Sequence, residues 1–117
     1  MCLGQKEVLP MKYDPAEKRY HVDHAHMDAE LGARVVNDAL QLAQALGYDM
    51  NTAEFAVRDG VPYAIDFMNP APDMDINSLT PPYFEWVVQH MADMVIDLAQ
   101  NPRPQLTELK WQSFFNQ

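Results

Sequence analysis

Cysteine, basic side chains and long apolar runs are all scarce in this chain of 117 residues. The single cysteine, Cys2, excludes an intrachain disulfide framework and is typical of a reducing cytoplasm. Only 8 Lys and Arg stand against 17 Asp and Glu, and the resulting net charge of −9 argues against nucleic acid or an anionic membrane as a partner. No run approaches the roughly 20 apolar residues that span a bilayer. We therefore expect a cytoplasmic protein that binds neither nucleic acid nor membrane.

The hydrophobic share of 48% is enough for one modest core, and the pattern along the chain predicts two long helices. The segment Asp28–Leu46 has an apolar stripe at helical spacing, begins with an N-capping aspartate and ends at Gly47. A second helix follows Thr80, which we expect to act as its N-cap, and ends before Pro102. Residues 2–11 and 19–22 read as strands, joined by the turn-forming residues 14–17.

The stretch Asn51–Asp73 predicts a β-hairpin with acids on one face. Apolar and small or acidic residues alternate before and after the turn Arg58–Gly60, which is typical of half-buried strands. A two-residue Asp59-Gly60 loop would pair Val57 with Pro62 and set Glu54 opposite Ile65, on the core face. We therefore expect a three-residue loop with a bulge at Gly60, which pairs Val57 with Val61.

In that register Glu54 lies opposite Ala64, and Asp66 falls on the same face, diagonal to Glu54. Asn69 follows at the end of the second strand and can add an amide oxygen. Two carboxylates and an amide that converge on open space suit Mg²⁺, which takes a few protein oxygens and shares the rest with water and phosphates. The alternative interpretation is a hairpin with two solvated acids on its outer face.

The run from Glu54 through Asp66-Phe-Met-Asn69 to Pro70 resembles the metal-binding end of the ATP-grasp family. There, an acid on one strand and an acid-x-x-Asn on the next hold the magnesium of ATP. The helix end Ala45–Tyr48 and the segment Gly4–Pro15 also resemble that family's C-terminal lobe, so that the likeness covers about residues 2–100. The chain departs from the family at Asp66, where Glu is commoner.

This resemblance implies an α+β fold, with a mainly antiparallel sheet of about four strands and two long helices packed on one face. It implies an ATP-dependent ligase that joins a small-molecule acid to an amine or thiol through an acylphosphate. Glu54, Asp66 and Asn69 would hold Mg²⁺ or Mn²⁺ against the phosphates of ATP, the co-substrate. The family's nucleotide-cradling lobe, with its lysines and mobile Gly-rich loop, is expected N-terminal to Cys2. Residues 1–102 would then be an incomplete domain, and that missing lobe its partner.

Several further residues are candidates for contact with phosphate or substrate. Lys12 and Arg19 are candidates for a place in the cleft, and His21 and His24 for the loop beside it. The run His21–His26 leaves three interpretations open: a transition-metal site that uses His24 and His26, a loop that contacts substrate or phosphate, or a solvated turn. Asp73 could face an amine substrate or, with Asp75, cap the turn before Thr80, and we favour the cap.

A second hypothesis makes the chain a truncated, non-catalytic lobe that self-associates or binds another protein. Two segments are apolar enough to drive this, the strand Cys2–Leu9 and the tail 103–117. The tail carries Trp111, Phe114 and Phe115. We expect another copy of the chain as a partner, in a homodimer or larger species, and no ATP hydrolysis or ligation by the chain alone.

Overall fold

A four-stranded antiparallel sheet forms the centre of the computed structural model, which describes residues 1–23 and 25–104. Its strands pair in the order β2-β1-β5-β6. They are β1 (Cys2–Leu3), β2 (Glu7–Val8), β5 (Met50–Arg58) and β6 (Val61–Asn69). The predicted α+β class with a four-stranded antiparallel sheet is therefore confirmed.

The N-terminal segment contains two short hairpins, and the prediction of one strand over residues 2–11 is wrong. Gly4 and Gln5 both have positive φ, 61° and 57°, and turn the chain back so that Cys2 pairs with Val8. The second hairpin pairs β3 (Lys12–Asp14) with β4 (Arg19–His21) in a separate two-stranded sheet. Its turn spans residues 15–18, one residue later than the predicted 14–17.

Both long helices form where the sequence predicts them. The helix α1 spans Ala29–Leu46, with the Asp28 carboxylate accepting a hydrogen bond from the backbone N–H of Leu31 and Gly47 in the left-handed conformation at its end. The helix α3 spans Pro81–Gln100. No described helix is both long and apolar enough to cross a bilayer.

Thr80 is the N-cap residue of α3, as expected, but a short helix before α3, which the sequence analysis missed, changes how it acts there. This helix is α2 (Ile76–Leu79), and Thr80 joins it to α3 with a φ of 68°. The Thr80 side chain forms no capping hydrogen bond, because the residue serves as the corner between two helices. Two consecutive prolines pre-set the first turn of α3 instead.

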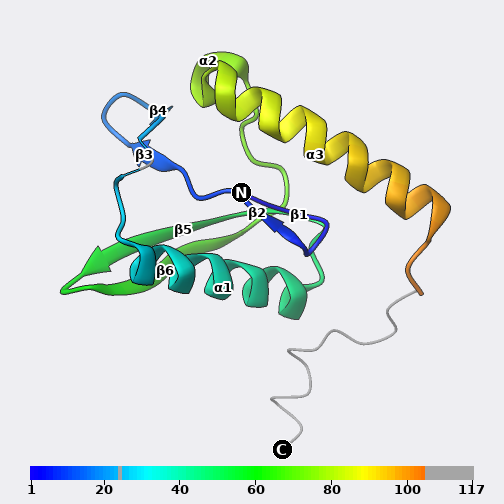
Figure 1. Cartoon of the computed structure of the whole chain (residues 1–117), viewed down its shortest axis with the longest axis horizontal. Helices are drawn as coiled ribbons and strands as arrows, with labels where there is room; N and C mark the ends of the chain where they lie inside the picture. Colours follow the sequence, from blue (N-terminus) through cyan, green and yellow to red (C-terminus); the bar gives the residue numbers. More distant parts are fainter. Residues whose placement is uncertain (24, 105–117) are drawn as a thin grey trace, which may run out of the picture.

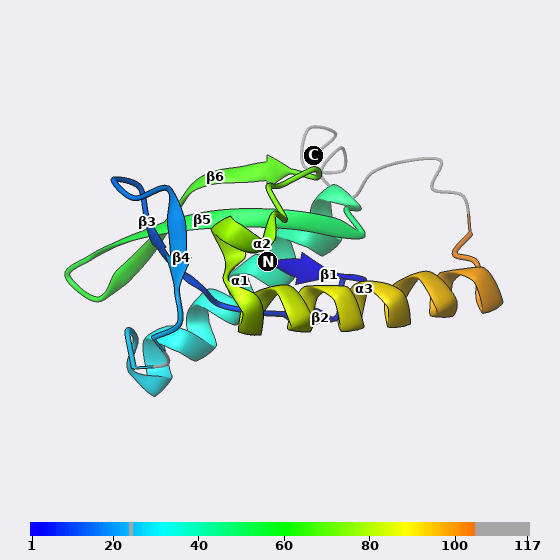
Figure 2. The ribbon, with the colours of Figure 1, turned by 90° about the horizontal axis from the view of Figure 1, so that it is seen from above.

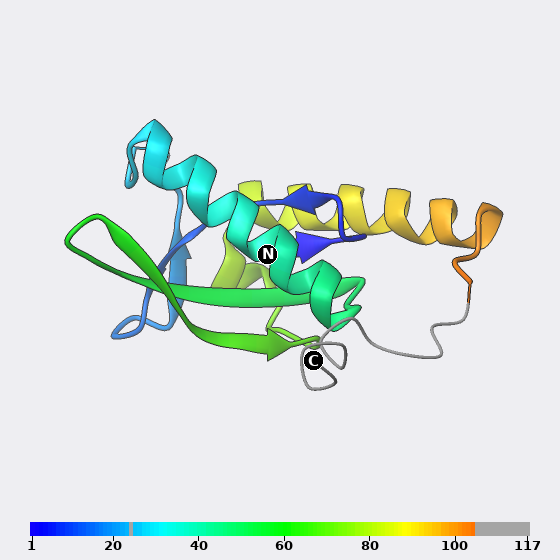
Figure 3. The ribbon, with the colours of Figure 1, turned by 90° about the horizontal axis from the view of Figure 1, so that it is seen from below.

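The two long helices lie on opposite sides of the sheet, not on one face as expected (Figure 1). Seen from above, α3 runs in front, next to β1 and β2, and seen from below, α1 runs in front and α3 lies behind (Figures 2 and 3). Successive residues of a strand point to opposite faces, and both Cys2 and Leu3 are buried because each face of β1 is covered. Leu3 packs with the α2 and α3 residues Leu79, Tyr83 and Val87.

Candidate metal and substrate site

The hairpin β5–β6 turns through two residues, and the prediction of a three-residue loop is wrong. Asp59 and Gly60 have φ of 52° and 74°, and the ladder begins with Arg58 opposite Val61 and Val57 opposite Pro62. A two-residue turn with positive φ at both positions matches the right-handed twist of the strands, and Asp-Gly is among its preferred sequences. The conformational preference of Asp59-Gly60 therefore sets the pairing of the residues next to the turn.

Two register shifts further along the hairpin bring the acids together. Phe55 pairs with Ala64, but the next pair is Glu54 with Asp66, so that Ile65 is an extra residue on β6. A second shift precedes the pair of Thr52 and Asn69. Directly opposed residues lie on the same side of a ladder. Glu54 and Asp66 thus share a face through bulges, not through the register expected from the sequence.

A buried asparagine, which the sequence analysis did not single out, fixes the backbone between Asp66 and Asn69. Asn51 is fully buried and is the second residue of β5, where it pairs with Cys2 of β1. Its side-chain NH₂ donates to the carbonyl of Phe67 at 3.0 Å, and its side-chain oxygen accepts from the N–H of Asn69 at 3.0 Å. The available signal was an asparagine inside a strand, where this residue type is depleted.

Both carboxylates of the acid pair are exposed, and the pair is uncompensated by a cation. Among residues 1–23 and 25–104, neither Glu54 nor Asp66 forms an ion pair. Like charges directly opposite on neighbouring strands destabilise a sheet. Glu54 also acts on β4: burial raises the pKa of the Tyr20 hydroxyl, and the negative charge of Glu54 adds to that increase. Glu54 and Tyr20 also line one common cavity.

A cavity of about 540 Å³ adjoins Glu54. It lies along the edge of β5 beyond Asn51, where β1 no longer pairs with β5, and the β3–β4 hairpin and the first half of α1 complete its walls. Most of its lining is apolar, for example Met11, Leu31 and Phe55, whereas Lys12 and Glu54 bring opposite charges. Its size and its few polar groups are those of a small-molecule pocket.

Of the predicted basic residues, Lys12 lies at this cavity. Its ammonium group is 3.2 Å from a carboxylate oxygen of Asp23, and this hydrogen bond lowers the pKa of Asp23. Arg19 is exposed on β4, opposite Asp14 in the ladder, and is not among the residues that line the cavity. The two basic residues therefore do not converge on one place.

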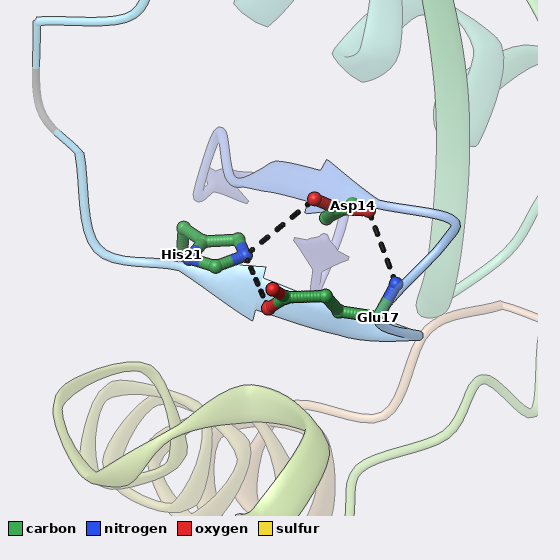
Figure 4. Close-up of side chains that lie close together, drawn as sticks. All are labelled: Asp14, Glu17 and His21. Atoms are coloured by element: carbon green, nitrogen blue, oxygen red, sulfur yellow. Dashed lines mark hydrogen bonds and ion pairs between the residues drawn. The ribbon is translucent and has the colours of Figure 1, made fainter.

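Two histidines of the run His21–His26, at its ends, have different surroundings. His26 lines the cavity, and its Nδ1 atom hydrogen-bonds to the carbonyl oxygen of Asp23. His24 lies outside the described residues. His21 is not among the residues that line the cavity, and it points toward Asp14 and Glu17 of its own hairpin (Figure 4). A metal site built from His24 and His26 thus stays a prediction.

Asp73 and Asp75 cap a helix, as we favoured. Asp75 is the N-cap of α2 and accepts from the N–H of Asn77 at 2.7 Å. Asp73 accepts from the N–H of Asp75 at 2.9 Å and from the hydroxyl of Ser78 at 2.6 Å, and these bonds lower its pKa. Both oxygens of Asp73 therefore serve the turn, which leaves the substrate-facing alternative without support.

Of the two segments that we expected to drive self-association, the structure tests only the one at the start of the chain. Cys2 and Leu3 are buried, so that the start of the chain is not the exposed strand we expected. The residues Trp111, Phe114 and Phe115 of the tail lie outside the described residues. Burial raises the pKa of the Cys2 thiol, which is consistent with an inert core cysteine.

Comparison with protein-family models, curated proteins and solved structures found no match.

Proposed function

We propose that this chain is the metal- and ATP-phosphate-binding portion of an ATP-dependent carboxylate–amine or carboxylate–thiol ligase that acts in the cytoplasm. The observation that carries the proposal is the directly opposed pair Glu54–Asp66, with Asn69 following on a backbone held by Asn51. A pair of uncompensated acids at this point is costly unless a cation neutralises it. The same three residues carry the resemblance to the ATP-grasp family.

The donor set fits Mg²⁺ or Mn²⁺. Two carboxylates and one amide oxygen are hard ligands, and their exposure leaves room for the water and phosphate oxygens that complete the coordination of these ions. Glu54, Asp66 and Asn69 would hold the ion. When bound, it would neutralise charge on the phosphates of ATP and orient the transferring phosphoryl group.

The chain's own residues would bind and orient the reactants. Glu54 and Asp66 would fix the phosphate end of ATP through the ion. Lys12 would break its ion pair with Asp23 and bind phosphate or the acid substrate through its ammonium group. The apolar cavity beside Glu54 would hold the apolar part of the substrate and exclude water from an acylphosphate. The amine or thiol would then displace phosphate from that acylphosphate.

The nucleotide-cradling lobe of the ATP-grasp family would supply the remaining contacts to ATP. We therefore propose that this lobe packs against the acid face, and that the chain alone neither hydrolyses ATP nor ligates substrates. A sample of the chain that converts ATP to ADP, and that loses this activity in Asp66→Asn, would contradict the second statement.

Paramagnetic Mn²⁺ tests the metal site directly. In amide NMR spectra of the full chain, Mn²⁺ should broaden signals next to Glu54, Asp66 and Asn69 at lower concentrations than it broadens any others. Glu54→Gln and Asp66→Asn should each weaken this binding at least about tenfold, because each removes a charged ligand. ATP should strengthen Mn²⁺ binding, because its phosphates add ligands.

Asp59→Asn is the matched control, because it removes the same charge from the exposed turn at the other end of the hairpin. It should leave the broadening unchanged. Broadening that is centred elsewhere and that persists in Asp66→Asn would refute the metal site.

A second candidate function, self-association, has its own supporting observation. The strand β6 is last in the order of the sheet, so that one of its edges is unpaired among the described residues. Three large apolar side chains are exposed on it, Tyr63, Ile65 and Met68, and Ile65 is 64% exposed. An apolar edge strand pairs readily with another chain.

Light scattering across a wide concentration range tests this second candidate. A dimer that dissociates in Ile65→Lys, with Mn²⁺ binding intact, would support association through β6 of another copy. A monomer mass at every concentration would refute it.

A further inference from the structure

A second cluster of metal-binding side chains lies on the β3–β4 hairpin, apart from the acids of β5 and β6. Asp14 ends β3, Glu17 lies in the turn and His21 ends β4, and their side chains point toward one another (Figure 4). The Nε2 atom of His21 is 3.2 Å from a carboxylate oxygen of Glu17 and 3.9 Å from one of Asp14. One ligand atom from each residue lies within 4.8 Å of the others.

The Nε2 atom of His21 is aimed into this cluster. The side chain of His21 is 40% exposed, but Nε2 itself is covered by the two carboxylates that it faces, and it makes only ion-pair contacts with them, without a hydrogen bond of good geometry among the described residues. Imidazole nitrogen is the ligand that distinguishes a transition-metal site from a cluster of acids alone. Nε2 therefore lies where a metal ligand would lie.

The two carboxylate oxygens of Asp14 have different partners, and this fixes the orientation of the side chain. Its Oδ1 atom accepts from the N–H groups of Ala16 and Glu17 at 2.8 and 3.1 Å, and these bonds lower the pKa of the carboxyl group. Its Oδ2 atom remains turned toward His21. The turn thus presents one carboxylate oxygen of Asp14 in a set direction, as ligands of bound metals are presented by hydrogen bonds of their own.

We propose that Asp14, Glu17 and His21 form a binding site for a divalent transition metal, with Zn²⁺ as the ion that the donors fit best. Donor atoms about 2.0–2.2 Å from a tetrahedral zinc ion lie roughly 3.3–3.6 Å apart. The separation of 3.2 Å between His21 and Glu17 is already close to this, and that of 3.9 Å to Asp14 requires a small inward movement. Water or a substrate group would occupy the fourth position.

The ion would join the two ends of the hairpin that forms a wall of the cavity. Tyr13 and Tyr20, which adjoin the ligands Asp14 and His21 in sequence, line the cavity, and their rings are 4.9 Å apart. The backbone carbonyl of His21 accepts a hydrogen bond from the Tyr83 hydroxyl at 3.1 Å, which connects the hairpin to α3. Metal binding would therefore order this wall and attach it more firmly to the core.

Isothermal titration of the full chain with ZnCl₂, in buffer that contains excess Mg²⁺, tests the site. We expect one ion per chain and changes in the imidazole NMR signals of His21. Asp14→Asn, Glu17→Gln and His21→Ala should each weaken binding at least about tenfold. Glu17→Gln is the most conservative, because the residue is exposed in a turn, and Asp14→Asn keeps the Oδ1 acceptor of the turn.

Two controls separate this site from the alternatives. His26→Gln should keep Zn²⁺ binding, and its loss there would place the ion in the His24–His26 segment and overturn the proposal. Asp66→Asn should also keep it, so that a failure of the magnesium site and a failure of this one are distinguishable. Absence of saturable Zn²⁺ binding, or binding unaffected by Glu17→Gln, would equally refute the hairpin site.

Discussion

Replacing the buried Asn51 tests how the fold positions the candidate site. The substitution Asn51→Ala removes the bridge to β6 and leaves two backbone groups without their partner, the carbonyl of Phe67 and the N–H of Asn69. The bridge stands where the second register shift interrupts the ladder between β5 and β6. We expect the substitution to destabilise the fold and to loosen the backbone that carries Asn69.

The size of the effect follows from the orphaned groups. A buried donor or acceptor left unpaired costs about 1–3 kcal/mol, so that two partly buried groups should lower the free energy of unfolding by about 2–4 kcal/mol. For an m-value of about 1.5 kcal/mol per molar urea, 3 kcal/mol corresponds to a fall of roughly 2 M in the midpoint of unfolding. Mn²⁺ binding should weaken in the same variant.

Urea unfolding, followed by circular dichroism, measures the first effect, and two further variants control it. Asn37→Ala removes an asparagine from the exposed face of α1 and should change stability by less than about 0.5 kcal/mol. Asn51→Leu restores the lost volume but not the hydrogen bonds, and it should remain destabilised. If Asn51→Leu matches the wild type, the residue fills space and the bridging argument is wrong.

Two further predictions concern the turns. Gly60→Ala should lower the free energy of unfolding by about 1–2 kcal/mol, because Gly60 has a φ of 74° that L residues avoid, although there is space for the added methyl group. The control Gly32→Ala, at an equally open position on α1, should not destabilise the protein. Hydrogen bonds, first from Ser78, lower the pKa of Asp73 below its ordinary value of 3.8. Its contribution to stability is therefore present above that value and is lost as the pH falls through the lowered pKa. Asp73→Asn should reduce stability in urea at neutral pH and flatten the loss below about pH 4, and identical acid profiles for both proteins would contradict this.

Features set by adjacent residues could be predicted from the sequence, and features set by distant ones could not. The ends of α1 follow from Asp28 and Gly47, which act on the backbone within one turn. The partners of Asn51 are 16 and 18 residues away, and no periodic pattern signals them. The turn at Gly60 was misjudged because the expected register placed its one bulge at Gly60, whereas the register shifts lie further along the strands, around Glu54.

The approach of His21 to Asp14 and Glu17 is an intermediate case. The spacing of three and four residues between Asp14, Glu17 and His21 is visible in the sequence, but the spacing of His24 and His26 gave the stronger signal, because extended segments present alternate residues on one face. The hairpin instead turns at residues 15–18, and its register brings β4 back beside β3. When a sequence predicts a hairpin turn, it also predicts which side chains before and after that turn lie close enough to bind one metal ion.

The two ends of the β5–β6 hairpin have different physical supports, and this difference bears on function. At the turn, Asp59 and Gly60 are exposed and hold the strands together by local geometry alone. At the other end, Asn51 pairs with β1 through its backbone and holds β6 through its side chain, so that three strands meet at one fully buried residue. The acids lie between these ends, nearer the buried one, on a face that no described ion pair neutralises. Rigid support for exposed, uncompensated charge costs stability and serves no packing purpose. This cost is the strongest physical reason to interpret the acid pair as a binding site.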